Sequence, residues 1–360
     1  MDIVNAQNID SPALLLIKEN LLHNLDLMIR MVDGDTNRLI PHIKTNKSSK
    51  VIAEMLKKGL TKFKAATISE AELAAKVGAK EVLLAHQPVG PKIERCIALQ
   101  KTYPELKFAV IVDNVVSAFD LNEAFGRQGL TLKVFIDVNV GMNRTGIELA
   151  QLNSLIENIS TLDKLELAGL HIYDGHLRDT DAEARAQKVV NWQIELITNS
   201  KYAADLAWIV GGSPTFPIHA KNKDHVCSPG TTVFWDEGYG HSFSDVAFKE
   251  AIVILSRVIS KPKEGIVTID LGHKSVAAEN PIDKRIKFLN ITDATLVSQS
   301  EEHGVLEVKN WNDFQIGQII YGIPFHVCPT VNLHQSLYVM ESDKIVDEWA
   351  VEARDRKLSI

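Results

Sequence analysis

Short apolar runs rich in β-branched residues recur along the first two thirds of the chain, separated by segments with apolar residues at helical spacing. Runs of this kind are typical of parallel strands that helices cover on both faces. Eight such units in this length favour a closed (β/α)₈ barrel over an open doubly wound sheet. The expected barrel strands are 39–44, 62–67, 81–86, 107–113, 132–138, 165–173, 206–212 and 225–234.

The pattern changes after about residue 247, where the links between apolar runs become short and rich in turn residues. Short links leave little room for helices, so this region is predicted to be a mainly antiparallel β domain. A strand at 13–18 precedes the first long helix and is expected to pair with this domain. We therefore predict a barrel at 20–246 and a β-rich domain formed by 1–19 with 247–360.

Charge and composition narrow the possible classes of function. The 360 residues carry a formal net charge of −7, which disfavours a nucleic-acid or anionic-membrane surface because both need clustered Lys and Arg. The N-terminal sequence lacks the features of a secretory signal, and no apolar run approaches the roughly 20 residues that span a bilayer. Three cysteines far apart do not predict a disulfide framework. We expect a cytoplasmic enzyme.

The first predicted barrel strand ends in the segment 41–47, Pro-His-Ile-Lys-Thr-Asn-Lys. Barrel enzymes carry their catalytic groups at the carboxyl ends of the strands, so Lys44 is expected at the barrel mouth. An amine there can serve as a Schiff-base nucleophile. The alternative is a rim lysine held in a salt bridge.

Two glycine-containing loops, 211–215 and 228–232, follow the seventh and eighth predicted strands. Glycine lets backbone N–H groups approach an anion, and these two positions are where barrels commonly bind phosphate. Either loop alone would be read as a turn. The candidate phosphate-binding residues are Gly212, Ser213, Thr215, Gly230 and Thr231.

Three more polar side chains follow predicted strands five and six. Arg144 could hydrogen-bond a phenolate or a carboxylate. Tyr173 and His176 have polar tips suited to holding a ring or moving a proton. A buried tyrosine and a surface histidine are the alternative interpretation of the last two.

The predicted β domain contains His326 and Cys328 in the segment Pro-Phe-His-Val-Cys-Pro-Thr. On an extended segment, side chains two residues apart project to the same side and could share a cation such as Zn²⁺. Two protein ligands leave coordination positions open for water and substrate, as a catalytic metal requires. An isolated His-x-Cys pair also arises often by chance.

Taken together, these segments resemble the fold-type III pyridoxal-phosphate enzymes, and among them the D-threonine aldolase and D-serine dehydratase group with its alanine racemase-like barrel. The resemblance covers nearly the whole chain. The segments that carry it are 11–16, 41–45, 67–72, 144–146, 211–213, 301–304 and the Pro-x-His-x-Cys run ending at Cys328.

The resemblance implies a role for each matching residue. Lys44 would bind pyridoxal 5′-phosphate, residues of the two glycine-containing loops would surround its phosphate, and Arg144 would lie near its ring. His326 and Cys328 would bind a divalent cation, Zn²⁺, Mn²⁺ or Mg²⁺. The resemblance also implies a homodimer with active sites near its interface, acting on a small D-amino acid.

The motif details favour different members of the group. Asn46 stands where the group usually has histidine, and aldolases commonly have an acidic residue in place of Cys328. The segment 173–176, Tyr-Asp-Gly-His, is nevertheless more similar to aldolases. We expect metal-assisted retro-aldol cleavage of D-β-hydroxy amino acids to glycine and an aldehyde, with His176 as a candidate base. The alternatives are elimination to a 2-oxo acid and ammonia, a metal-free amino-acid racemase, and a non-catalytic pyridoxal-phosphate-binding protein.

Overall fold

The computed structural model describes residues 3–360. The chain forms two compact units. The barrel unit contains residues 28–44, 51–230 and 355–360, and the β unit contains residues 3–27, 45–50 and 231–354. The domain boundaries predicted from the sequence remain a prediction.

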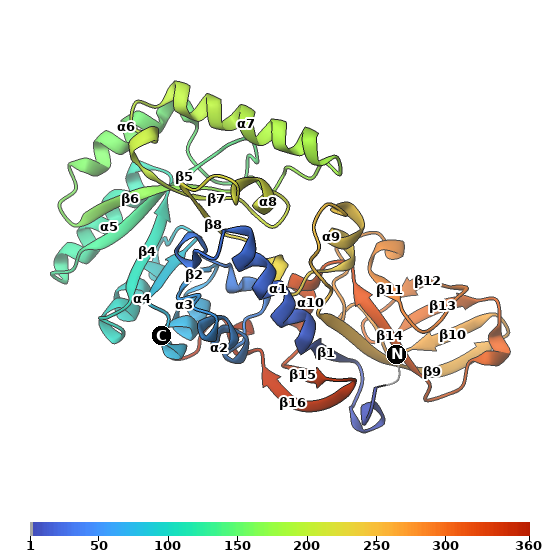
Figure 1. Cartoon of the computed structure of the whole chain (residues 1–360). Helices are drawn as coiled ribbons and strands as arrows, with labels where there is room; N and C mark the ends of the chain where they lie inside the picture. Colours follow the sequence, from blue (N-terminus) through green and yellow to red (C-terminus); the bar gives the residue numbers. More distant parts are fainter. Residues whose placement is uncertain (1–2) are drawn as a thin grey trace. The chain divides into compact units, whose positions relative to one another are not determined.

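The barrel unit is built on seven parallel strands in the sheet order β2-β3-β4-β5-β6-β7-β8 (Figure 1). These strands are β2 (Lys62–Ala65), β3 (Glu81–Leu84), β4 (Lys107–Val112), β5 (Leu132–Val138), β6 (Leu165–Ile172), β7 (Ala207–Val210) and β8 (His225–Cys227). The helices of this region are α2 (Ser49–Lys57), α3 (Ile68–Val77), α4 (Pro91–Thr102), α5 (Val115–Arg127), α6 (Leu149–Ser160), α7 (Ala182–Asn199) and α8 (Phe216–His219). The alternation of strand and helix confirms the predicted TIM-type architecture.

The segment that starts the barrel differs from the predicted strand 39–44. Leu39 forms an isolated parallel bridge with Cys227 of β8, and His42 forms one with Lys64 of β2. The segment thus joins both edges of the seven-stranded sheet and takes the eighth position. Pro41 cannot donate a ladder hydrogen bond, which limits regular pairing here. Ile43–Thr45 then turns into a 3₁₀ helix, so Lys44 lies on a turn and does not close a strand.

The interior of the barrel is filled by apolar side chains. Ile40, Leu83, Ala109, Ile111 and Ile209 form one buried cluster, with Phe135 and Val226 packed against it. These side chains come from β3, β4, β5, β7 and β8 and from the closing segment, as expected for a barrel whose interior is a packed core. Ile111 of this cluster also lines the cavity at the carboxyl ends of the strands.

The β unit contains a second sheet of nine strands. Its strands are β1 (Ala13–Ile17), β9 (Ile252–Lys263), β10 (Ile266–Ile269), β11 (Ile286–Phe288), β12 (Ala294–Gln299), β13 (Gly304–Val308), β14 (Ile319–Pro324), β15 (Ser336–Glu341) and β16 (Lys344–Ala350). β1 pairs antiparallel with β9 and parallel with β15, which confirms that the N-terminal strand belongs to this sheet. Its remaining pairs are antiparallel.

Two other helices belong to the β unit, α9 (Glu237–Ser242) and α10 (Val327–Leu333), while α1 (Lys18–Met31) begins in the β unit and ends in the barrel unit. The sequence predicts one strand over 286–298, where the structure has two, β11 and β12. The predicted strand 225–234 ends at Cys227, and β16 was not predicted. No helix among the described residues has the length and apolarity needed to span a bilayer.

Candidate active site

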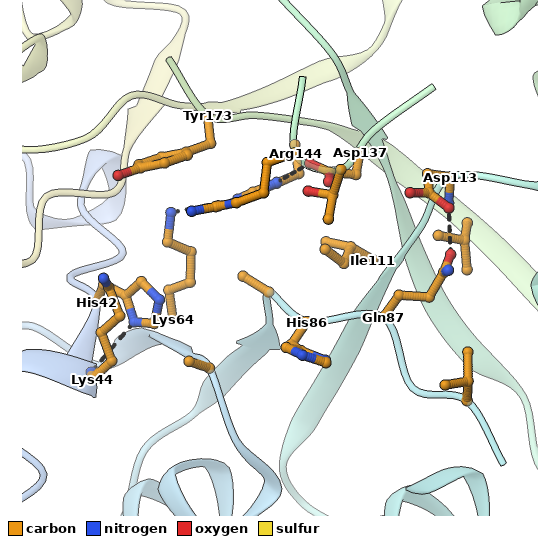
Figure 2. A pocket seen from close by; sticks show the side chains of 16 residues that line it. His42, Lys44, Lys64, His86, Gln87, Ile111, Asp113, Asp137, Arg144 and Tyr173 are labelled. Carbon is orange, nitrogen blue, oxygen red and sulfur yellow. Dashed lines mark hydrogen bonds and ion pairs between the residues drawn. The ribbon is translucent and has the colours of Figure 1, made fainter. Parts of the chain in front are cut away.

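A cavity of about 550 Å³ opens at the carboxyl ends of the barrel strands. Lys44, Lys64, Asp137, Arg144, His171 and Tyr173 are among the residues that line it. Figure 2 shows Lys44, Lys64, Asp137, Arg144 and Tyr173 around one space. A cavity at this end of a barrel, with several convergent ionisable groups, is the expected place for chemistry. The sequence-predicted Lys44, Arg144 and Tyr173 are therefore brought together by the fold.

Lys44 is half-buried and lines the cavity from the turn after the closing segment. Its backbone N–H donates to His42 Nδ1 at 3.4 Å. Among residues 3–360, no carboxylate lies within ion-pair distance of the Lys44 amine. The salt-bridged rim lysine considered from the sequence is therefore not what the structure contains.

Arg144 and Tyr173 meet on one side of the cavity. The guanidinium carbon of Arg144 lies 5.1 Å from the centre of the Tyr173 ring, a cation–π distance. Tyr173 also packs against the backbone of Gly212, because a Cβ built at Gly212 would lie 2.9 Å from Tyr173 Cε2. The glycine thus allows the ring to rest on the loop after β7.

The two predicted phosphate-binding loops are in contact within the barrel unit. The N–H of Gly230 donates to Ser213 Oγ at 3.3 Å. Thr215 is used differently from the prediction: its hydroxyl donates to Asp174 Oδ1 at 2.6 Å and accepts from the N–H of Gly212 at 3.2 Å. In this arrangement the Thr215 hydroxyl holds the loop in shape through Gly212 and Asp174.

Asp174 stabilises this loop through its hydrogen bond with Thr215. Its second oxygen is 2.9 Å from His219 Nε2, and both side chains are fully buried. Burial alone would raise the pKa of Asp174, but the charge and hydrogen bond of His219 and the hydrogen bond of Thr215 outweigh it and lower the pKa. The carboxylate form is thus favoured in the folded protein.

We expect Asp174→Asn to lower the free energy of unfolding at pH 7 by about 3 kcal/mol, the scale for breaking a buried pair. Because the folded-state pKa of Asp174 is depressed, its contribution is present above the unfolded pKa of about 3.9 and is lost as pH falls through the folded pKa. Urea unfolding at pH 7 and at decreasing pH measures both. Asp179→Asn, which breaks the Asp179–Lys188 surface pair, is the control. Equal stability of the wild type and Asp174→Asn at pH 7 would contradict the prediction.

Lys64, Asp137 and His171 line the cavity and were not among the candidate residues of the sequence analysis. His171 Nδ1 lies 2.7 Å from Asp137 Oδ1, and His171 Nε2 lies 3.4 Å from Lys64 Nζ. Each of their strands carries a second charged residue, so a polar residue within the strand was not a distinguishing signal. Burial alone would raise the pKa of Asp137, but the hydrogen bond with His171 outweighs it and lowers the pKa. Burial lowers the pKa of His171.

His176 does not line the cavity. Its side chain is exposed and lies beside Gly141 in the loop after β5, where a Cβ at Gly141 would be 3.1 Å from His176 Nε2. The structure therefore places His176 at the outer loops, apart from Lys44, Arg144 and Tyr173.

His326 and Cys328 lie at the start of α10 in the β unit. His326 is the residue before the helix and Cys328 is in its first turn, so the extended segment predicted from the sequence is wrong. The side chains are nevertheless adjacent: burial lowers the pKa of His326, but hydrogen bonds with Cys328 and Glu279 outweigh it and raise the pKa to about 9. Thr45 Oγ1 and Thr231 Oγ1 lie 3.2 Å and 3.4 Å from Cys328 Sγ.

This donor set fits an open metal site. Imidazole and thiolate are ligands of Zn²⁺ and similar ions, and Glu279 bonds His326 Nδ1, the partner that commonly orients a ligating histidine. Within residues 3–360, no cluster of three or more His, Cys, Asp or Glu is arranged to hold a metal. A metal bound by His326 and Cys328 would keep its other positions for water or substrate.

Comparison with known proteins gives two matching families and several relatives. Residues 18–237 match the alanine racemase N-terminal domain, and residues 251–340 match a putative serine dehydratase domain. The chain is 27% identical over 358 residues to a D-threonine aldolase of Arthrobacter sp, covering 96% of this chain and 93% of that one. It is 24% identical to a D-threo-3-hydroxyaspartate dehydratase of Delftia sp., covering 95% of this chain and 97% of that one.

Solved structures share the whole fold. The crystal structure of D-threonine aldolase from Filomicrobium marinum matches with a TM-score of 0.85 at 25% identity, covering 97% of this chain and 96% of the other. A cysteine-to-alanine variant of D-threo-3-hydroxyaspartate dehydratase in its metal-free form matches with a TM-score of 0.81 at 20% identity, covering 97% and 99%. At that identity the second likeness shows the fold alone.

Proposed function

Because the chain belongs to the family of the alanine racemase N-terminal domain, we propose that it is a pyridoxal phosphate-dependent lyase acting on D-β-hydroxy amino acids. The observation that carries the proposal is Lys44, an amine without a carboxylate partner in a cavity shared with Arg144 and Tyr173. Relatives named as an aldolase and a dehydratase support the lyase class.

The residues present fit the cofactor. Lys44 would hold its aldehyde carbon, and Arg144 and Tyr173 offer a cation and a ring beside it. The loop carrying Gly212 and Ser213 meets the turn carrying Gly230 and would hold the phosphate, with Thr231 following in the chain. Bound pyridoxal phosphate supplies an electron sink for the bond broken at Cα.

We propose that His326 and Cys328 bind a divalent cation, Zn²⁺ or Mn²⁺ and less favourably Mg²⁺, which prefers oxygen ligands. A cation bound there would lower the pKa of a coordinated hydroxyl. The solved metal-free form of a cysteine variant of a dehydratase supports a metal in such relatives.

We favour retro-aldol cleavage to glycine and an aldehyde. The support is the aldolase named among the relatives that match nearly the full chain and the aldolase-like segment 173–176. His176 remains the proposed acceptor of the hydroxyl proton, although it lies outside the cavity lining. His176→Ala should therefore lower kcat for cleavage while leaving cofactor binding intact. An unchanged kcat would remove this role from His176.

Elimination to a 2-oxo acid and ammonia is the second candidate, favoured by the thiol of Cys328 where aldolases carry a carboxylate. Incubation of the purified protein with D-threonine and with D-serine, followed by assays of glycine, 2-oxo acid and ammonia, separates the two reactions. We expect glycine from D-threonine, and loss of activity in EDTA. Activity that persists in EDTA with only L-amino acid formed would replace both candidates by a metal-free racemase.

A further inference from the structure

A second lysine, Lys64, lies in the cavity and has no part in the function proposed so far. It comes from β2, is 2% exposed, and lies with its amine 5.6 Å from the centre of the Tyr173 ring. Figure 2 shows its side chain extending across the cavity toward Tyr173 and Arg144. The fold thus places two lysines, Lys44 from the turn after the closing segment and Lys64 from β2, around one space.

The groups in contact with the Lys64 amine are neutral and do not balance its positive charge. Its amine donates to Ser228 Oγ and to His171 Nε2, both uncharged acceptors in this arrangement. No carboxylate lies within ion-pair distance of it among the residues that the structure describes. Burial, and next the charge of Lys44, lower the pKa of Lys64 to about 7, against a smaller opposing effect of Asp137. Burying a cation without a counter-ion costs free energy, and a bound anion would offset that cost.

The neighbours of Lys64 fix where its amine points. His171 Nδ1 faces the Asp137 carboxylate and therefore carries the ring proton, which leaves Nε2 as an acceptor for the lysine. Ser228 stands two residues before Gly230, whose N–H meets Ser213 of the loop after β7. Lys64 consequently reaches the same turn that is proposed to hold the cofactor phosphate.

We propose that Lys64 is a cofactor-binding residue, whose ammonium donates a charge-assisted hydrogen bond to an acceptor atom of the pyridoxal phosphate held on Lys44. This inference rests on the proposed function. A bound dianion would bring negative charge within hydrogen-bond distance of Lys64, closer than the Asp137 carboxylate that opposes the lowering of its pKa. The contact with Ser228 favours the cofactor over the substrate as the occupant, because Ser228 belongs to the proposed cofactor turn.

The test is the affinity for the cofactor, measured on protein stripped of pyridoxal phosphate and titrated with it while absorbance and tryptophan fluorescence are recorded. Lys64→Met keeps the length of the side chain and removes its charge. We expect it to weaken binding about 10- to 100-fold, the scale of a hydrogen bond to a charged group. Lys64→Arg keeps the charge and should lose less. Lys133→Met, which removes an exposed lysine of β5 paired with Glu166, should bind as the wild type does.

Cofactor analogues identify the contacted atom. If Lys64→Met and the wild type bind pyridoxal, which lacks the phosphate, with equal affinity, Lys64 contacts the phosphate. If they bind an analogue lacking the ring nitrogen with equal affinity, Lys64 contacts that nitrogen. If Lys64→Met binds both analogues more weakly than the wild type does, Lys64 contacts the phenolic oxygen. Circular dichroism and the melting temperature verify folding, and Lys64→Gln replaces Lys64→Met if the latter does not fold.

Two failures are distinguishable. If the wild-type protein takes up no pyridoxal phosphate, the proposed function is wrong. If the wild type binds it and folded Lys64→Met binds it equally well, the role of Lys64 is overturned and the proposed function stands. Unchanged cofactor affinity with weaker binding of D-serine by the Lys64→Met holoenzyme would likewise overturn it, since Lys64 would then contact the substrate.

Discussion

Lys44→Ala is expected to abolish covalent cofactor attachment and to lower lyase activity at least about 10³-fold, the scale seen when a catalytic nucleophile is removed. Borohydride reduction of the wild type should fix the cofactor irreversibly on one peptide, which mass spectrometry assigns to Lys44. The physical reason is the location of Lys44. It is a half-buried amine in the cavity without a carboxylate partner, so nothing in the protein must be displaced before it reacts.

The control for this prediction is Lys57→Ala, which removes an exposed lysine of α2 paired with Glu54 and should leave both attachment and activity unchanged. The cavity also supplies an internal competitor, because Lys64 carries a second amine in the same space. Reduced cofactor found on Lys64 in the wild type would show that the wrong lysine has been assigned. A fixed cofactor of wild-type yield on any residue of Lys44→Ala would refute the assignment as well.

The fold was largely predictable because burial on both faces leaves a simple signature. β5 (Leu132–Val138) was predicted with the bounds it has. Successive residues of a barrel strand face the core and the surrounding helices in turn, so both faces are mostly apolar and the strand is a nearly continuous apolar run. β16 (Lys344–Ala350) was missed because it is an edge strand, mostly exposed, whose polar residues hide the apolar pattern. The segment 39–44 was predicted as a strand from its apolar residues, although its pairing is confined to two bridges.

The candidate site was predictable where a residue followed a strand and unpredictable where it lay within one. Tyr173 comes directly after β6 and Arg144 lies in the loop after β5, and the carboxyl end of a barrel strand places both at the barrel mouth. Lys64 and His171 lie inside their strands, so whether they point inward or outward depends on the closure of the barrel, which sequence spacing does not specify. Their mutual contact joins residues 107 positions apart, and only the folded chain brings them together.

His326→Ala is expected to remove the bound divalent cation and to lower lyase activity by at least about 10²-fold while cofactor binding is retained. The proposed ligands His326 and Cys328 are adjacent at the start of α10. A site with two protein ligands has none to spare, so the loss of either should release the metal on dialysis. Elemental analysis of the dialysed protein measures this, and the cofactor absorbance shows that the barrel remains loaded.

Two companion variants make the metal prediction specific. His334→Gln, at the other end of α10, keeps a donor for the carbonyl oxygen of Ser275 and should leave metal content unchanged. Cys328→Asp replaces a thiolate by a carboxylate, so it should retain a cation but shift the preference from Zn²⁺ toward Mn²⁺. If His326→Ala keeps its full metal content, the cation binds elsewhere. If it loses cofactor together with metal, the effect lies in folding, and the assignment of His326 as a ligand fails with it.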